Sequence, residues 1–426
     1  MKIRLHNARI LTMNKDEEIF LGEVIVNNDR IEEVRKGSAD DDNAAYDKVI
    51  DCKGNLLMPG FKNAHAHSGM SVLRSLADDK PLYDWLTQDI FPVEAKMTAE
   101  DIYWMSQLSA LEYLTSGITA CFDMYLDNPA MAKAMDDFGF RCVQVGGVND
   151  FSDDLTKIER MYLSLNKPDS LQSYQLGYHA EYTTSLENHK KIAEIVQRQK
   201  APLYVHACET KSEVEGCKER YGMTPVQFMD SLGLFDFGGG IYHGVHMSEE
   251  DFAVMKKRGL YVVTNPGSNT KLASGIAPIT EYVKRGIPVA IGTDGPASNN
   301  CLDFFREMFL VAGLAKLHDD DAAALDAKEV LTMATVNGAR AMLLKDCETL
   351  SAGQKADMIM IDLLQPNMQP INNIEKNIVY SGSKQNVKMT MINGRILYYN
   401  NEFFTDIAPM TIYEKVAEIK ERLLAN

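Results

Sequence analysis

The sequence predicts an α/β fold: a (β/α)8 barrel in residues 58–345, with a small β-sandwich domain formed from both termini. Three observations support this prediction. Eight short apolar runs alternate with segments of helical periodicity through the middle of the chain. Polar side chains that can do chemistry cluster where these runs end. Residues 1–57 and 346–426 contain strand and hairpin patterns instead.

The eight apolar runs are the expected barrel strands. They alternate with stretches such as SLENHKKIAEIVQRQK and SEEDFAVMKKRG, whose apolar residues recur three and four positions apart. In chain order the runs are LLMPGFKNAH, ITACFDM, RCVQVGG, YQLGYHA, PLYVHAC, GIYHGVH, LYVVTNP and PVAIGTD. Active sites of such barrels form at the carboxyl ends of the strands, so the residues that end these runs are the functional candidates.

The two ends of the chain are expected to join in one sheet domain. EVIVNNDRIEEVRK contains an Asn-Asn-Asp turn signal, and VKMTMINGRILYYN places Asn393-Gly394 between two apolar runs. Because a sheet with one apolar face must pack on a partner, both β-rich ends are predicted to form a single domain beside the barrel. An amphipathic helix, TIYEKVAEIKERLLAN, ends the chain and is assigned to this domain.

The charge of the chain excludes some classes of partner. Forty-four Lys and Arg residues against sixty Asp and Glu residues give a net charge of −16, which repels nucleic acid and anionic membranes. The opening residues contain no apolar core of signal-peptide length, and no run approaches the roughly 18 apolar residues of a spanning helix. We therefore expect a cytoplasmic protein with a small-molecule substrate, and the pattern leaves open whether it forms a homo-oligomer.

The seven cysteines are scattered and form no C-x-x-C pair, which argues against a disulfide framework and against a structural zinc cluster. Cys208 lies between two candidate site residues, and we interpret it as a small buried apolar residue. A metal site in this chain is therefore expected to use histidines and carboxylates.

Four residues at strand ends form a candidate metal site. His65 and His67 are one residue apart, so their side chains point the same way from a strand; alone, such a pair is often incidental. His206 ends the fifth run and Asp294 ends the eighth, which completes a set of three nitrogens and one oxygen. This set suits a catalytic divalent ion that keeps a position for water. The alternative for Asp294 is a loop residue that caps the next helix.

Three more residues are candidates for proton transfer. Glu209 follows His206 by three residues and is expected to lean over the barrel mouth, where it can carry protons; its alternative role is an acid at a helix start. His243 and His246 both follow the sixth run, and either could hydrogen-bond the attacking oxygen.

Several motifs together resemble the amidohydrolase superfamily, in particular its branch of 5′-methylthioadenosine/S-adenosylhomocysteine deaminases. The resemblance runs nearly end to end and implies a barrel, a β-sandwich, and one zinc (sometimes iron) held by the four candidate ligands. It also implies that Glu209 is the proton shuttle and that His243, rather than His246, is the catalytic imidazole. The motifs are MPGFKNAHAH, HACETKSEV, YHGVHMSEE, NPGSNTKLASGIAPI and IGTDGPASNN.

The resemblance also implies substrate contacts. Glu94 matches a carboxylate that binds ribose hydroxyls, His179 matches a contact from the fourth strand, and Arg141 is a candidate for a third contact. The structural alternatives are a solvated acid, a buried polar residue and a surface charge, respectively. The chain departs from the family where Thr264 precedes Asn265, since relatives often carry His there. A further arginine of the purine-nucleoside deaminases has no clear counterpart around SDDLTKIERMYLSLN.

The resulting hypothesis is a hydrolytic deaminase that releases ammonia from an aminopurine nucleoside. The metal would lower the pKa of its water from about 15.7 toward about 7. Glu209 would carry the released proton to a ring nitrogen, while His243 and the metal would stabilise the oxygen of the tetrahedral intermediate. Asp294 would help to move a second proton to the departing amine.

Aminohydrolases of another ring are the alternative: guanine, a pterin, a triazine or a cyclic amide. Guanine deaminases typically carry Arg-Phe where this chain has His179-Ala180, and two-metal cyclic amidases need a lysine that the run SYQLGYHAEYT lacks. The P-C-x-x-C of cytidine deaminases is also missing from the sequence. A non-catalytic scaffold is disfavoured because the full set of ligand and proton-transfer candidates is present.

Overall fold

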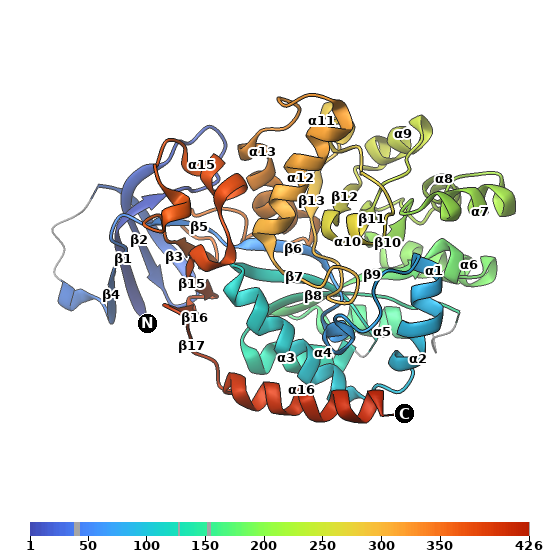
Figure 1. Ribbon diagram of the computed structural model, residues 1–426, viewed down its shortest axis with the longest axis horizontal. Helices are drawn as coiled ribbons and strands as arrows, with labels where there is room; N and C mark the ends of the chain where they lie inside the picture. The colour runs from blue at the N-terminus through green and yellow to red at the C-terminus, as the bar shows by residue number, and fades with distance from the viewer. Residues whose placement is uncertain (38–42, 127, 151–154, 426) are drawn as a thin grey trace.

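The barrel predicted for the middle of the chain is present in the computed structural model, which describes all residues except 38–42, 127, 151–154 and 426 (Figure 1). Eight parallel strands pair in chain order. The barrel closes where the amide of Asp294 donates to the carbonyl of His65 at 3.0 Å. The strands are β6 (Phe61–Ala66), β7 (Ile118–Met124), β8 (Arg141–Val145), β9 (Gln172–Ala180), β10 (Leu203–Ala207), β11 (Gly239–His243), β12 (Tyr261–Thr264) and β13 (Val289–Ile291).

Helices cover the outside of the barrel, and several begin at capping boxes that the sequence encodes. Thr98 with Asp101, Thr210 with Glu213, and Ser248 with Asp251 exchange side-chain and backbone hydrogen bonds at three helix starts. The covering helices are α3 (Ala99–Thr115), α4 (Asn128–Phe138), α5 (Thr156–Leu165), α6 (Leu186–Gln199), α7 (Lys211–Tyr221), α8 (Pro225–Ser231), α9 (Glu249–Arg258), α10 (Pro266–Lys271), α11 (Ile279–Lys284), α12 (Phe304–Asp319), α13 (Ala327–Thr332) and α14 (Gly338–Ala341). Two short helices, α1 (Leu82–Trp85) and α2 (Phe91–Glu94), lie between β6 and α3.

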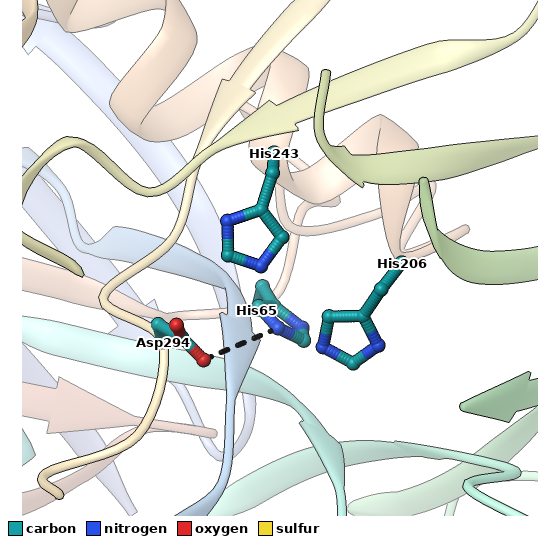
Figure 2. A group of neighbouring side chains, drawn as sticks. All are labelled: His65, His206, His243 and Asp294. Atoms are coloured by element: carbon teal, nitrogen blue, oxygen red, sulfur yellow. Dashed lines mark ion pairs between the residues drawn. The ribbon is translucent and has the colours of Figure 1, made fainter. Parts of the chain in front are cut away.

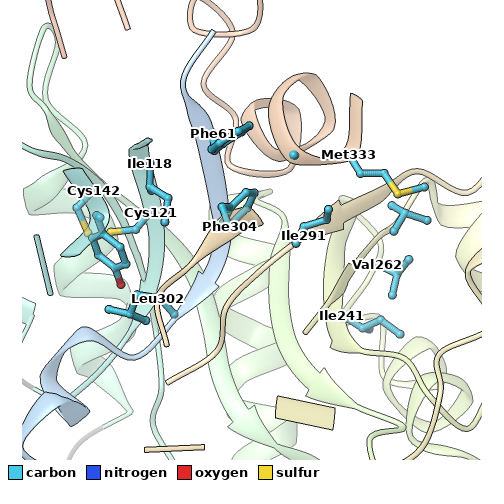
Figure 3. Close-up of a cluster of buried hydrophobic side chains, with 14 of the residues drawn as sticks. Phe61, Ile118, Cys121, Cys142, Ile241, Val262, Ile291, Leu302, Phe304 and Met333 are labelled. Atoms are coloured by element: carbon cyan, nitrogen blue, oxygen red, sulfur yellow. The ribbon is translucent and has the colours of Figure 1, made fainter. Parts of the chain in front are cut away.

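Apolar side chains fill the barrel on both faces of its strands. Outside, Phe61 of β6 stacks on Phe304 of α12 with ring centroids 5.4 Å apart, within the layer drawn in Figure 3. Inside, Phe122 packs against Tyr204 at 4.7 Å. Burial on both faces explains the nearly continuous apolar runs of the sequence. Because the interior is filled, a substrate can bind only at an end of the barrel.

The two ends of the chain form one nine-stranded sheet beside the barrel, as predicted. The expected first barrel run, LLMPGFKNAH, divides at Gly60: its first half pairs in this sheet and its second half is β6. The predicted domain boundary at residues 57 and 58 thus falls inside a strand. The strands are β1 (Lys2–Ile10), β2 (Phe20–Asn27), β3 (Arg30–Lys36), β4 (Lys48–Asp51), β5 (Leu56–Pro59), β14 (Met358–Ile361), β15 (Val387–Ile392), β16 (Arg395–Tyr399) and β17 (Glu402–Phe403).

The C-terminal helix α16 (Pro409–Leu424) lies along α3 of the barrel (Figure 1). Its Ile412, Ile419 and Leu423 are buried, and Arg422 pairs with Asp101 of α3. The helix was expected to belong with the terminal sheet, but its apolar stripe packs on the barrel. Among the described residues, no helix is both long and apolar enough to cross a membrane.

Candidate active site

Histidines and a carboxylate meet at the carboxyl end of the barrel strands. The ligand atoms of His65, His206, His243 and Asp294 all lie within 4.8 Å of one another, and Figure 2 shows the four side chains converging. His67 lies beside this group, with its Nε2 3.1 Å from Asp294 Oδ1. The structure therefore brings the four expected ligands together and places His243 among them.

Hydrogen bonds orient three of the imidazoles. The Nδ1 atoms lie 2.6 Å from the carbonyl oxygen of Met124 for His67, and 2.7 Å from that of His179 for His206. The Nδ1 of His243 lies 2.8 Å from the side-chain oxygen Oδ1 of Asn269. Because a carbonyl oxygen only accepts, each Nδ1 carries a proton, and in the neutral ring Nε2 keeps the lone pair with which it can bind a metal. This arrangement is typical of histidines that bind a metal.

His65 has unsatisfied polar atoms that a metal would satisfy. Its ring is fully buried and stacks on Tyr242 with centroids 3.8 Å apart. Neither ring nitrogen makes a hydrogen bond to the described residues, although Nε2 lies 3.5 Å from Asp294 Oδ1. Buried nitrogens without partners are costly. A divalent ion between these side chains fits the donor set of imidazoles and one carboxylate.

Asp294 is held as a carboxylate. Burial opposes its ionisation, but the neighbouring imidazoles of His65 and His67 outweigh burial and hold its pKa well below the ordinary value. Its Oδ2 accepts a hydrogen bond from Ser298 Oγ at 3.0 Å, which leaves Oδ1 facing the histidines. The side chain therefore points into the site instead of capping the next helix.

Left-handed backbone conformations mark the strand ends at the site. His243, Asp294 and Cys208 have φ values of 72°, 60° and 56°. Such values are uncommon for residues other than glycine, and they concentrate at functional sites. Cys208 is buried, as expected, and its carbonyl accepts the amides of Val245 and His246.

Glu209 lies against His243. Its Oε2 is 3.7 Å from His243 Nε2, and its Oε1 accepts a 3.4 Å hydrogen bond from Ser274 Oγ. Burial raises the pKa of Glu209, which suits a group that must both take and give a proton. The carboxylate that caps α7 is Glu213, which accepts the amide of Glu209 at 2.7 Å. Glu209 is thus left free for chemistry.

His246 does not reach the metal-suited group. Its Nε2 lies 2.7 Å from the carbonyl oxygen of Ser274, in a loop on the rim. Of the two histidines in the YHGVH motif, only His243 is in the group. The preference for His243 over His246 agrees with this placement.

One cavity is lined by the expected proton-transfer residues and by two of the expected substrate contacts. Glu94, His179, Glu209, His243 and Asp294 all line it. A second cavity of about 810 Å³ adjoins it, and Glu94 lines both. The rest of the first cavity's wall is largely apolar and aromatic, and includes Trp85, Leu86, Phe91, Tyr125 and Tyr182. The cavity therefore suits a flat, partly apolar molecule with a few polar groups.

Glu94 and His179 have environments that suit binding a neutral, hydroxyl-rich ligand. The Oε1 of Glu94 is buried without a hydrogen-bond partner among the described residues. Burial raises the pKa of Glu94 to about 7, against the lowering effect of the Tyr125 hydroxyl. His179 Nδ1 lies 3.0 Å from Thr183 Oγ1, and burial lowers the pKa of its ring to about 4. His179 is therefore neutral at pH 7.

Arg141 lies at the opposite end of the barrel, so the expected substrate contact is wrong. It begins β8, at the amino end of the strand, and it is buried. Its Nε and Nη2 donate to the two carboxylate oxygens of Asp357 at 2.6 and 3.0 Å, and Nη2 also lies 3.5 Å from Asn393 Oδ1. The guanidinium joins the barrel to the terminal sheet.

Sequence reasoning missed three residues that contact the expected proton-transfer groups. Glu213 fixes the backbone at Glu209, Asn269 accepts from His243, and Ser274 donates to Glu209. The Thr210–Glu213 capping pattern was readable from the sequence. The other two lie in the NPGSNTKLASGIAPI motif, where the pattern shows turn chemistry but not which side chain faces the site.

Comparisons with known proteins agree on one family. Residues 56–397 match the model of the amidohydrolase family. The chain is 39% identical over 422 residues to a 5-methylthioadenosine/S-adenosylhomocysteine deaminase of Caldanaerobacter subterraneus subsp. tengcongensis, covering 97% of both proteins. It is 37% identical over 435 residues to a 5'-deoxyadenosine deaminase of Methanosarcina mazei, covering 100% of this chain and 99% of the relative.

A solved structure supports the same assignment. The adenosine deaminase from Xanthomonas campestris with bound zinc is 29% identical, covers 99% of this chain and 98% of its own, and superposes with a TM-score of 0.92. With the family matched over most of the sequence, the chain belongs to the amidohydrolase family and is a hydrolase that acts on carbon–nitrogen bonds.

Proposed function

We propose that the protein is a metal-dependent deaminase that releases ammonia from an aminopurine nucleoside resembling 5′-methylthioadenosine, S-adenosylhomocysteine or adenosine. One observation carries the proposal: a single cavity joins the metal-suited group, the Glu209–His243 pair and the carboxylate of Glu94. The metal-suited group and the Glu209–His243 pair suit hydrolysis at a ring carbon. The carboxylate of Glu94 suits a ribose, whose hydroxyls donate hydrogen bonds to a carboxylate. The two relatives, named as deaminases of 5-methylthioadenosine/S-adenosylhomocysteine and of 5'-deoxyadenosine, support the same substrate class.

The metal in this proposal is held by His65, His67, His206 and Asp294. The support is the orientation of the imidazoles, together with the buried and unpartnered nitrogens of His65. Zinc is the proposed ion, because this donor set suits zinc and the Xanthomonas neighbour binds it; iron is the alternative. When bound, such an ion lowers the pKa of a water toward about 7 and so supplies a nucleophile at neutral pH.

The remaining polar residues move protons and bind the substrate. Glu209 takes the proton of the attacking water and passes it to a ring nitrogen, for which its raised pKa is suited. His243 hydrogen-bonds the attacking oxygen through Nε2, and Asp294 assists the proton transfer to the departing amine. Glu94 binds the ribose hydroxyls, and the neutral His179 binds the ring from the fourth strand.

The test is a screen for ammonia release by the zinc-loaded protein. The substrates are adenosine, 5′-methylthioadenosine, S-adenosylhomocysteine, guanine and a pterin. The proposal expects turnover of one or more of the three nucleosides and little turnover of the free bases. Activity confined to guanine or the pterin would overturn the role of Glu94 and favour an aminohydrolase of another ring. A zinc-loaded protein that is inert toward all five would contradict the proposed deaminase.

A further inference from the structure

One short segment, Pro266–Gly275, contacts both proton-transfer residues of the site. It consists of α10 and the loop that follows it. Asn269 on this segment meets His243, and Ser274 meets Glu209. We propose that Asn269 and Ser274 are positioning residues for the deamination: Asn269 sets the tautomer of His243, and Ser274 determines which oxygen of Glu209 transfers the proton. This inference rests on the proposed function of the site.

The contact between Asn269 and His243 determines which ring nitrogen of His243 carries the proton. Asn269 Oδ1 lies 2.8 Å from His243 Nδ1, and both side chains are buried. Because the amide oxygen only accepts, the neutral ring carries its proton on Nδ1. The lone pair of Nε2 then faces Glu209 Oε2 at 3.7 Å. Without Asn269, the ring could place its proton on Nε2, which could then no longer accept a hydrogen bond from the attacking water.

The contact between Ser274 and Glu209 makes the two carboxylate oxygens unequal. Ser274 Oγ donates to Oε1 at 3.4 Å, whereas Oε2 faces His243. We therefore assign the transferred proton to Oε2, the oxygen that faces His243, while Ser274 holds Oε1. The hydroxyl also keeps the carboxylate from rotating away from the substrate ring.

The segment is anchored at both ends by residues outside the site. At its start, the amide of Gly267 donates to the buried carboxylate of Glu307 at 2.9 Å. A side chain at position 267 would meet Glu307 Oε1 at 2.4 Å, so a close approach requires the glycine there. At its end, His246 Nε2 donates to the carbonyl of Ser274 at 2.7 Å. His246 therefore acts on the loop and not on the substrate.

Two pairs of substitutions separate positioning from folding. Asn269→Leu keeps the size but removes the acceptor, whereas Asn269→Asp keeps an acceptor for Nδ1. Ser274→Ala removes the hydroxyl and Ser274→Thr retains it. Thr270→Val is the matched control, because Thr270 lies on the same helix, is exposed, and bonds only its own backbone turn through Pro266.

The proposal expects kcat to fall about tenfold to hundredfold in Asn269→Leu and about tenfold in Ser274→Ala, which is the range for losing a hydrogen bond to a charged or reacting group. KM and zinc content should change little. Asn269→Asp and Ser274→Thr should recover most of the lost kcat, and Thr270→Val should match the wild type. If kcat fell equally in Asn269→Asp and Ser274→Thr, or if only KM changed, the positioning roles would be overturned.

A direct readout does not depend on activity. In zinc-loaded protein with nitrogen-15 histidine, the ring resonances of His243, assigned by comparison with His243→Gln, should show protonated Nδ1 in the wild type and Asn269→Asp. Asn269→Leu should shift the ring toward protonated Nε2. An unchanged tautomer in Asn269→Leu would contradict the role of Asn269, whether or not the protein deaminates nucleosides. A wild type with the expected tautomer but no deaminase activity would instead refute only the proposed function.

Discussion

The two ends of the barrel both bury ionisable side chains, but they differ in whether the polar atoms of these side chains have hydrogen-bond partners. At the amino ends of the strands, Arg141 and Asp357 make two hydrogen bonds to each other, and Lys62 donates to the carbonyl of Gly60 and to Thr119 Oγ1, both at 2.8 Å. At the carboxyl ends, both nitrogens of His65 and one oxygen of Glu94 have no partner among the described residues.

The difference teaches how to separate structural from functional polar residues in this protein. A buried charge with all its partners within the chain stabilises one arrangement of the domains. A buried ionisable side chain at the cavity or the metal-suited group, with atoms that the fold orients but does not satisfy, is available to a ligand. On this criterion Lys62 and Arg141 are structural, whereas we assign His65 and Glu94 to the proposed site.

Glu209→Gln should have the largest effect. The amide cannot carry a proton, so kcat should fall by about a thousandfold or more, within the usual range for general acid–base residues. Zinc content should stay that of the wild type, because Glu209 is not a proposed ligand. Glu215→Gln, on the exposed face of α7, is the control and should leave kcat unchanged. Substantial activity in Glu209→Gln would exclude the shuttle role.

Arg141→Met should remove the ion pair with Asp357 that joins the barrel to the terminal sheet, and so destabilise the protein. It leaves the carboxylate of Asp357 buried without its cation, which should lower the free energy of unfolding by about 3–5 kcal/mol. Chemical denaturation would measure the loss. At a temperature where the variant stays folded, its KM for 5′-methylthioadenosine should match the wild type. A raised KM with unchanged stability would mean that Arg141 acts on substrate after all.

Glu94→Gln should change substrate preference more than rate. Loss of the charged acceptor should raise KM for 5′-methylthioadenosine by about tenfold to hundredfold at pH 8. Steady-state kinetics with the matched base, adenine, as an inhibitor provides the control, because its affinity should change little. Equal weakening of nucleoside and base would place Glu94 against the ring and not the ribose.

The smallest effect is a pH dependence that Glu94 should impose. Burial raises its pKa from 4.5 to about 7, so the group is a carboxylate above about pH 7 and protonated below. Nucleoside binding needs the carboxylate, and KM should therefore rise a few-fold as the pH falls from about 8 to about 6. In Glu94→Gln this rise should vanish. A KM that rises equally in both proteins would assign the effect to another group.

The strand pattern predicted the barrel and the site, because side chains at the ends of parallel strands must converge. The same logic placed His206 and Asp294 together from positions far apart in the sequence. The substrate contact expected of Arg141 came from the family resemblance instead, and it failed because Arg141 begins its strand and pairs with Asp357. The strand pattern also missed Asn269 and Ser274, whose contacts depend on loop geometry that residue types alone do not specify.

The ligand set is the central claim, and metal analysis of two variants tests it most directly. His67 and His243 are both beside Asp294, and the geometry alone admits either as the third imidazole ligand. We predict that His243→Ala keeps about one zinc per chain and loses turnover, whereas His67→Ala loses most of its zinc. Loss of zinc from His243→Ala, with full zinc retained in His67→Ala, would contradict the account.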